Sequence, residues 1–325
     1  MSIVVSIFGM LALSVVLIKS AEVVVSSIRR IAAEVRVPSV LVSAIIIAAA
    51  TSFPELFIGI ASSVSGNQSL SLGNVIGSNI SNMSLVLGLA GVFGGTLYIR
   101  DTKFFNKEWI FSFLLGFSPM LLLWDRGLSR IDGVILLSLY ATYLFLLFHQ
   151  KVRTSREQPL DLHRFLRSIN DHRGPFAHSL VRFFAGLIVL LLAAHWLVGL
   201  SSDLAGVLGV PIFVVGLLIV SVGTTLPEVA FSYRSIRDGV PGLVVGNLLG
   251  TLAFNSTFIL GVVAIVNPIT ILHRRSYLIA LVAYLLTGFL FWVFARSKYR
   301  LSRWEAFLLL VLYVVFFVVQ FNLSY

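Results

Sequence analysis

The chain has 325 residues, of which 58% are hydrophobic and only 12% are charged. Soluble globular domains carry about 25% charged residues, so this composition excludes a soluble domain and indicates an integral membrane protein. The sequence contains no cysteine, which excludes disulfides, thiol catalysis and thiolate metal sites, and its net charge of +10 must be judged by where the charges lie.

Apolar segments long enough, or nearly long enough, to cross a bilayer as helices alternate with short polar connections. There are ten of them, at residues 3–28, 39–64, 70–95, 108–124, 132–149, 178–200, 211–235, 242–267, 276–295 and 304–323. We interpret the first as a retained span, because no basic region precedes it and no small-residue cleavage site follows it. The sequence therefore predicts an all-α integral membrane protein with ten transmembrane helices.

Lys and Arg residues are distributed unevenly between the two alternating sets of connections. One set holds eighteen of them and the other only four. Basic residues near span ends favour the cytoplasm. We therefore expect a multi-pass protein of the cell membrane with both termini on the non-cytoplasmic side, and we interpret the basic charge as an orientation signal rather than a nucleic-acid-binding surface.

Two parts of the chain align without a gap when Glu55 is placed on Glu228, and we call this the repeat alignment. Twelve of the 41 positions from 48 to 88 are identical in the second copy, and most of these are Pro, Glu, Gly or Asn. Equivalent positions are five spans apart, so the second copy must enter the membrane from the opposite side. The sequence predicts inverted five-helix repeats at 1–149 and 178–325, joined by a short cytoplasmic linker at 150–177. Transporters built from inverted repeats with interrupted helices bind substrate near the midplane, where the repeats meet.

Two glutamates lie inside predicted spans, Glu55 in the second and Glu228 in the seventh, at equivalent positions of the repeats. An ionisable side chain at membrane depth is costly and by default functional. Each follows a proline, which lacks an N–H and so leaves a carbonyl one turn earlier for another partner, such as a bound cation. Hard cations prefer oxygen ligands. Small residues, most with hydroxyls, share one helical face with each glutamate: Ala48, Thr51 and Ser52, and Ser221, Thr224 and Thr225.

A Gly-Asn-x-x-Gly element follows each glutamate at the same distance along the chain, beginning at Gly73 and at Gly246. Its glycines permit close approach to the interrupted helices. A four-residue spacing then places two polar side chains on one face, Ser78 with Asn82 and Thr251 with Asn255. One such element would indicate only helix packing, but two copies at the same distance from a membrane glutamate predict a site.

These paired elements, T-S-F-P-E with G-N-V-I-G-S-N and their second copies, resemble the α-repeats of the calcium/cation antiporter superfamily, most closely its prokaryotic sodium/calcium exchanger branch. The resemblance implies exchange of Ca²⁺ for Na⁺ by alternating access, with inorganic cations as transported ions, no cofactor and no protein partner. It implies that Glu55 and Glu228 hold Ca²⁺ centrally. The remaining implied ligands are Ala48, Thr51, Ser52, Ser78, Asn82, Ser221, Thr224, Thr225, Thr251 and Asn255.

Two departures from the family pattern bear on ion selectivity. Where members usually have G-S-N-I-F-[ND], this chain has G-T-L-A-F-N ending at Asn255, and Thr225 stands where Ser is usual. Some members have Asp at the position of Asn255, so this site holds two carboxylates. An antiporter of H⁺ against Ca²⁺ or another divalent cation therefore stays open, because protons compete for buried carboxylates.

Two other classes of protein are disfavoured. An intramembrane hydrolase would need a His–Glu constellation or a nucleophile–base pair, and no histidine lies in the second, third, seventh or eighth span. A passive channel is usually a symmetric oligomer around a pore, whereas this chain carries a pseudo-symmetric site within itself. We expect a transporter and not an enzyme.

Overall fold

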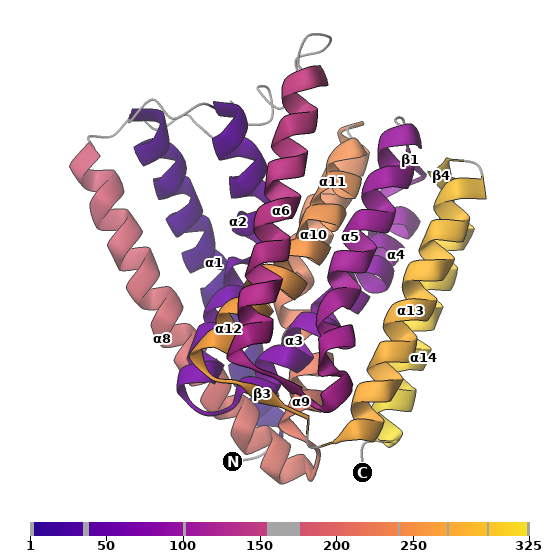
Figure 1. Cartoon of the computed structure of the whole chain (residues 1–325). Coiled ribbons are helices and arrows are strands. Elements are labelled where there is room, and N and C mark those ends of the chain that lie inside the picture. The colour runs from indigo at the N-terminus through magenta and orange to yellow at the C-terminus, as the bar shows by residue number, and fades with distance from the viewer. Residues whose placement is uncertain are drawn as a thin grey trace.

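The computed structural model describes residues 3–34, 39–99, 102–154, 176–239, 241–271, 273–297 and 299–323. These residues form a bundle of ten helical spans, as predicted, and eight of the spans contain a stretch apolar enough to cross a membrane (Figure 1). The first repeat contains α1 (Ile3–Glu34), α2 (Ser39–Val64), α3 (Gln68–Ser81) continued by η1 (Asn82–Val86), α4 (Leu87–Leu89) and η2 (Ala90–Gly94), then β1 (Leu97–Tyr98), α5 (Thr102–Leu122), η3 (Leu123–Asp125), β2 (Gly127–Leu128) and α6 (Arg130–Thr154). The second contains α8 (Phe176–Leu208), α9 (Ile212–Val215) continued by η4 (Gly216–Val220) and α10 (Ser221–Arg237), α11 (Gly242–Ala253) continued by η5 (Phe254–Ile259) and α12 (Leu260–Val266), then β3 (Ile269–Thr270), α13 (Arg274–Ser297), β4 (Arg300–Leu301) and α14 (Arg303–Asn322).

The inversion of the repeats is visible in how their connections pair. β1 pairs antiparallel with β4, and β2 pairs antiparallel with β3. The repeat alignment relates β1 to β3 and β2 to β4, so each pair joins the two repeats. In Figure 1 the β1–β4 pair lies at the end of the bundle where α6 ends, whereas β3 lies at the end that holds both termini. Equivalent elements thus lie at opposite ends of the molecule.

The backbone conformation supports the same relation. Arg126 (φ 74°) and Tyr299 (φ 47°) are the non-glycine residues with left-handed φ in the described ranges, and the repeat alignment places one on the other. Each directly precedes β2 or β4. Left-handed φ is uncommon outside glycine, so its recurrence at equivalent positions shows that both repeats turn in the same way.

Several helices are longer than predicted, among them α8 and α1. The sequence predicts a span over 178–200, but α8 runs from Phe176 to Leu208, 33 residues or about 50 Å. Similarly, α1 continues to Glu34 instead of ending at residue 28. The polar run after residue 200 indicated a span end, yet exposed polar residues such as Asp203 continue a helix without difficulty. Because the hydrocarbon core is only about 30 Å thick, α8 must tilt or extend beyond it.

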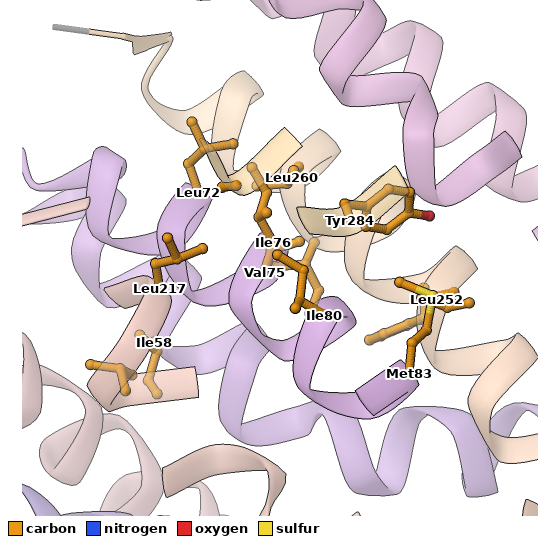
Figure 2. Close-up of a cluster of buried hydrophobic side chains, with 14 of the residues drawn as sticks. Ile58, Leu72, Val75, Ile76, Ile80, Met83, Leu217, Leu252, Leu260 and Tyr284 are labelled. Carbon is orange, nitrogen blue, oxygen red and sulfur yellow. The ribbon is translucent and has the colours of Figure 1, made fainter. Parts of the chain in front are cut away.

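The central helix α3 packs closely against the seventh span. A Cβ added at Gly73 or Gly77 would overlap a backbone carbonyl of that span, and one added at Gly216 would overlap the carbonyl of Leu70. Contacts this close require glycine on at least one of the two helices. The predicted close approach to the proline-containing span is therefore confirmed for the first repeat. The other side of α3 is apolar, and Figure 2 shows its side chains Val75 and Ile76 in a cluster of buried residues.

The interruptions in the helices differ from those expected at the prolines. α2 runs through Pro54 and α10 runs through Pro227 without ending. Instead, π-helical segments interrupt three spans, namely η1 and η2 in the third, η4 in the seventh and η5 in the eighth. A π-helical turn inserts an extra residue without breaking the helix, and such turns are frequent at functional sites. Each proline still lacks an N–H, so the carbonyl one turn earlier receives no hydrogen bond from it.

Candidate cation-binding site

The two predicted glutamates lie in the interior of the bundle. Glu55 on α2 is 0% exposed and Glu228 on α10 is 1% exposed. They come from opposite repeats and lie close enough together for their carboxylates to interact electrostatically. Two buried like charges destabilise a protein unless a positive charge compensates them. The pair therefore needs a compensating positive charge, from a bound cation or from protons.

Two hydrogen bonds connect the repeats around this pair. Thr51 on α2 donates to Oδ1 of Asn247 on α11 at 3.3 Å, and Thr224 on α10 donates to Oδ1 of Asn74 on α3 at 3.4 Å. The repeat alignment converts one bond into the other. The Thr224 hydroxyl is also a neighbour of the Glu55 carboxylate. Each threonine thus reaches across the boundary between the repeats.

A second group of polar side chains surrounds the first glutamate. Ser78 on α3 donates to Oε1 of Glu55 at 3.4 Å, and its hydroxyl lies 3.4 Å from that of Thr224. Both distances are at the long limit of hydrogen bonding. The arrangement brings together three predicted ligands from α2, α3 and α10.

Several buried oxygens of the predicted ligands have no hydrogen-bond partner among the described residues. They are Ser52 Oγ, Glu55 Oε2, Asn82 Oδ1, Glu228 Oε1 and Oε2, Thr251 Oγ1 and Asn255 Oδ1. The Thr51 hydroxyl is a neighbour of Glu228, but not in a geometry that satisfies either carboxylate oxygen. An unsatisfied buried polar group costs about 1–3 kcal/mol. Carboxylate, amide and hydroxyl oxygens are the ligands that Ca²⁺ and Na⁺ prefer, so this set fits a hard cation.

The other predicted ligands are placed less directly. Ser221 donates to the carbonyl of Leu217 at 2.6 Å, and Thr225 donates to that of Val222 at 3.2 Å, so both hydroxyls bond to their own span. Each is buried and keeps lone pairs that could accept a cation. Ala48 belongs to α2, but its side chain lies outside the described residues, and its role stays a prediction.

Sequence reasoning did not include four polar residues that the structure brings to the site. Asn74 and Asn247 accept the bonds that join the repeats, and the paired Gly-Asn elements could have indicated both. Asn79 donates to Oγ of Ser256 at 2.7 Å and accepts from Asn255 at 3.3 Å. The repeat gave no signal for this pair, because its equivalents in the other copy are apolar.

Inverted repeats that share a buried, oxygen-rich centre define a membrane transporter for cations. Comparison with known proteins gives the family: the model of the sodium/calcium exchanger protein family matches residues 5–149 and 178–322, which is most of the chain. The chain belongs to this family. It is therefore a multi-pass membrane cation exchanger and not an enzyme.

Individual relatives agree with this assignment. The chain is 27% identical over 259 residues to the inner membrane protein YrbG of Escherichia coli, covering 79% of each chain. It is 27% identical to the sodium/calcium exchanger MaX1 of Methanosarcina acetivorans, covering 94% of this chain and 96% of that one. Among solved structures, the sodium-calcium exchanger NCX_Mj soaked with Na⁺ and Sr²⁺ is similar, with a TM-score of 0.59, 26% identity and coverage of 97% of this chain and 98% of that one.

Proposed function

We propose that this protein exchanges Ca²⁺ for Na⁺ across the cell membrane by alternating access, with a midplane site built on Glu55 and Glu228. The observation that carries the proposal is the set of buried oxygens without partners around two carboxylates from opposed repeats, among the residues that the structure describes. The ionised pair has a charge of −2, which one Ca²⁺ or two Na⁺ neutralise. Isolated charges are penalised in low dielectric, so near-neutral occupied states should be favoured for crossing between the outward and inward forms. The two ions would then compete for one site.

The contacts between the repeats support a site that is present in both the outward and the inward form. Thr51 and Thr224 each donate to an asparagine of the other repeat. A displacement of one repeat against the other would change both contacts together. Transporters with inverted repeats open alternately to the two sides by such a displacement around a fixed midplane site.

The proposed organisation assigns 1–149 and 178–325 to the two repeats and 150–177 to a cytoplasmic linker. The two separate matches of the family model support this division. We further propose that both termini lie on the non-cytoplasmic side. The charge distribution supports this orientation, and Figure 1 places the two termini at the same end of the bundle.

Transport by purified protein in liposomes tests the proposal. Uptake of ⁴⁵Ca²⁺ should be driven by an outward Na⁺ gradient, and Glu55→Gln and Glu228→Gln should each abolish it while the protein still folds. Ser71→Ala is a matched control, because Ser71 is a buried polar residue of α3 outside the proposed site. If uptake is driven by a pH gradient and does not respond to Na⁺, then the countercation is H⁺ and not Na⁺. Near wild-type transport by either glutamine variant would show that this glutamate is not a primary ligand.

A further inference from the structure

The two asparagines at equivalent positions of the site differ in how they are held. Asn255 donates its amide nitrogen to Oδ1 of Asn79 at 3.3 Å, and Asn79 in turn donates to Oγ of Ser256 at 2.7 Å. All three side chains are at most 1% exposed. By contrast, neither the nitrogen nor the oxygen of the Asn82 side chain has a hydrogen-bond partner in the described parts of the chain.

The difference follows from two substitutions between the repeats. The repeat alignment pairs Asn79 with Leu252, and Ser256 with Met83. Leu252 and Met83 are both fully buried and belong to the apolar cluster in Figure 2. A polar pair on one side of the site is therefore replaced by an apolar pair on the other. Asn82 consequently has an apolar residue, Leu252, at the position equivalent to that of Asn79 beside Asn255.

We propose that Asn79, held by Ser256, is a positioning residue that fixes the orientation of the Asn255 amide and presents its oxygen to the transported cation. The inference rests on the proposed function, because it takes the site to bind cations. An asparagine amide can face a site with its oxygen or with its NH₂ group, and only the oxygen attracts a cation. Since the Asn255 nitrogen is bound to Asn79, the buried Oδ1 is left as the group without a partner in the described residues.

In the structure the Ser256 hydroxyl accepts the first bond of this chain. The Asn79 amide offers one nitrogen and one oxygen, and its nitrogen is engaged by the Ser256 hydroxyl. The Asn79 oxygen, which can only accept, then receives a hydrogen bond from the Asn255 nitrogen. The resulting site contains one amide oriented by a hydrogen bond, at position 255, and one at position 82 that no hydrogen bond from the described residues orients. Affinity for the cation should therefore depend more on the amide at position 255 than on the amide at position 82.

A double substitution that the fold already accommodates tests the proposal. Asn79→Leu with Ser256→Met places at these two positions the apolar residues that the repeat alignment pairs with them, Leu252 and Met83, which are buried together in the core. We expect cation affinity to fall about three- to tenfold, the effect of about one net hydrogen bond, with a smaller change in maximal rate. Ser256→Ala removes the hydroxyl and should lower cation affinity, whereas Ser256→Thr retains the hydroxyl and should keep the affinity above that of Ser256→Ala.

Comparing the double substitution in two backgrounds, with and without the Asn255 amide, distinguishes a positioning role of Asn79 from an effect on packing. We call a difference between the two backgrounds the coupling. Cation affinity is measured by thermal stabilisation of the purified protein with Ca²⁺, Sr²⁺ or Na⁺ added singly. In an Asn255→Ala background there is no amide to orient, so the double substitution should cause no further loss of affinity. The same loss in both backgrounds, or no loss in either, would overturn the proposal. Ser71→Ala again serves as the control for a buried polar change in α3.

This experiment does not depend on which ions are exchanged. If some added cation stabilises the protein and the coupling appears, the positioning role stands even when Ca²⁺ and Na⁺ fail to exchange in liposomes. If Ca²⁺ and Na⁺ do exchange but the coupling is absent, the proposed function stands and the positioning role fails.

Discussion

Replacing Gly77 with alanine tests whether close packing of α3 on the seventh span sets the geometry of the site. A Cβ at position 77 would lie 2.7 Å from Oγ and 2.8 Å from Cβ of Ser221, and would overlap the carbonyl of Leu217. Ordinary van der Waals contact begins near 3.4 Å, and the tightest overlap is with the Leu217 carbonyl, so the two spans would have to separate by about 1.2 Å or more. Backbone atoms cannot rotate away from the added methyl group as the end of a flexible side chain can.

The expected effect has a part on stability and a part on function. Adding a methyl group to a well-packed core costs about 1–3 kcal/mol. Ser78 follows directly in the chain, and its contacts with Glu55 and Thr224 are already 3.4 Å long. A further separation of α3 from the seventh span would break the contact between Ser78 and Thr224, which lies on that span. We therefore expect a lower midpoint of thermal unfolding and a loss of exchange larger than the loss of folded protein.

Gly199→Ala is the matched control for this variant. Gly199 is an exposed residue of α8, and no described atom lies within 4 Å of a Cβ built there. Alanine is about 1 kcal/mol more favourable than glycine inside a helix, so this variant should be as stable as the wild type or more so. Size-exclusion chromatography after heating gives the unfolding midpoint, and liposome uptake gives exchange per folded protein. Equal behaviour of the two variants in both assays would refute the reasoning.

Three further predictions follow from the site and the charge distribution. Thr51→Val and Thr224→Val remove equivalent bonds between the repeats, so each should weaken Ca²⁺ affinity to a similar extent, about three- to tenfold. The measurement is uptake as a function of Ca²⁺ concentration, and a loss of affinity in only one of the two variants would contradict a site with two-fold pseudo-symmetry. Asn255→Asp adds a third carboxylate, so Ca²⁺ uptake should become more dependent on pH or on Na⁺; unchanged dependence on both would mean that this residue does not face the cations. A cysteine near either terminus should react with impermeant reagents from outside the cell and one near Arg156 should not, whereas labelling of both termini from the cytoplasm would reverse the orientation.

The architecture could be predicted from the sequence because its signals are strong and local. Membrane spans are long apolar runs, and the inversion follows from an odd number of spans between equivalent positions. Glu55 and Glu228 are conspicuous because carboxylates inside apolar spans are rare. Both are buried and close enough to interact electrostatically, which is what a site shared by the two repeats requires.

The details that the sequence did not reveal depend on tertiary packing. The π-helical segments η1, η4 and η5 have no marker in the sequence comparable to a proline. The end of α8 was placed too early because helix formation does not stop at the first exposed polar residue. Asn79 was missed because comparing two repeats finds only the residues that both copies share.

The symmetric and asymmetric contacts of the site should act differently during alternating access. In an inverted-repeat transporter the inward and outward forms exchange the roles of the two repeats. A contact with an equivalent in the other repeat, such as Thr51 with Asn247 and Thr224 with Asn74, then contributes similarly to both forms. The bond between Asn79 and Asn255 has no such equivalent, because Leu252 stands at the related position. Its contribution can differ between the two forms, so we expect it to affect the difference in cation affinity between the two sides of the membrane.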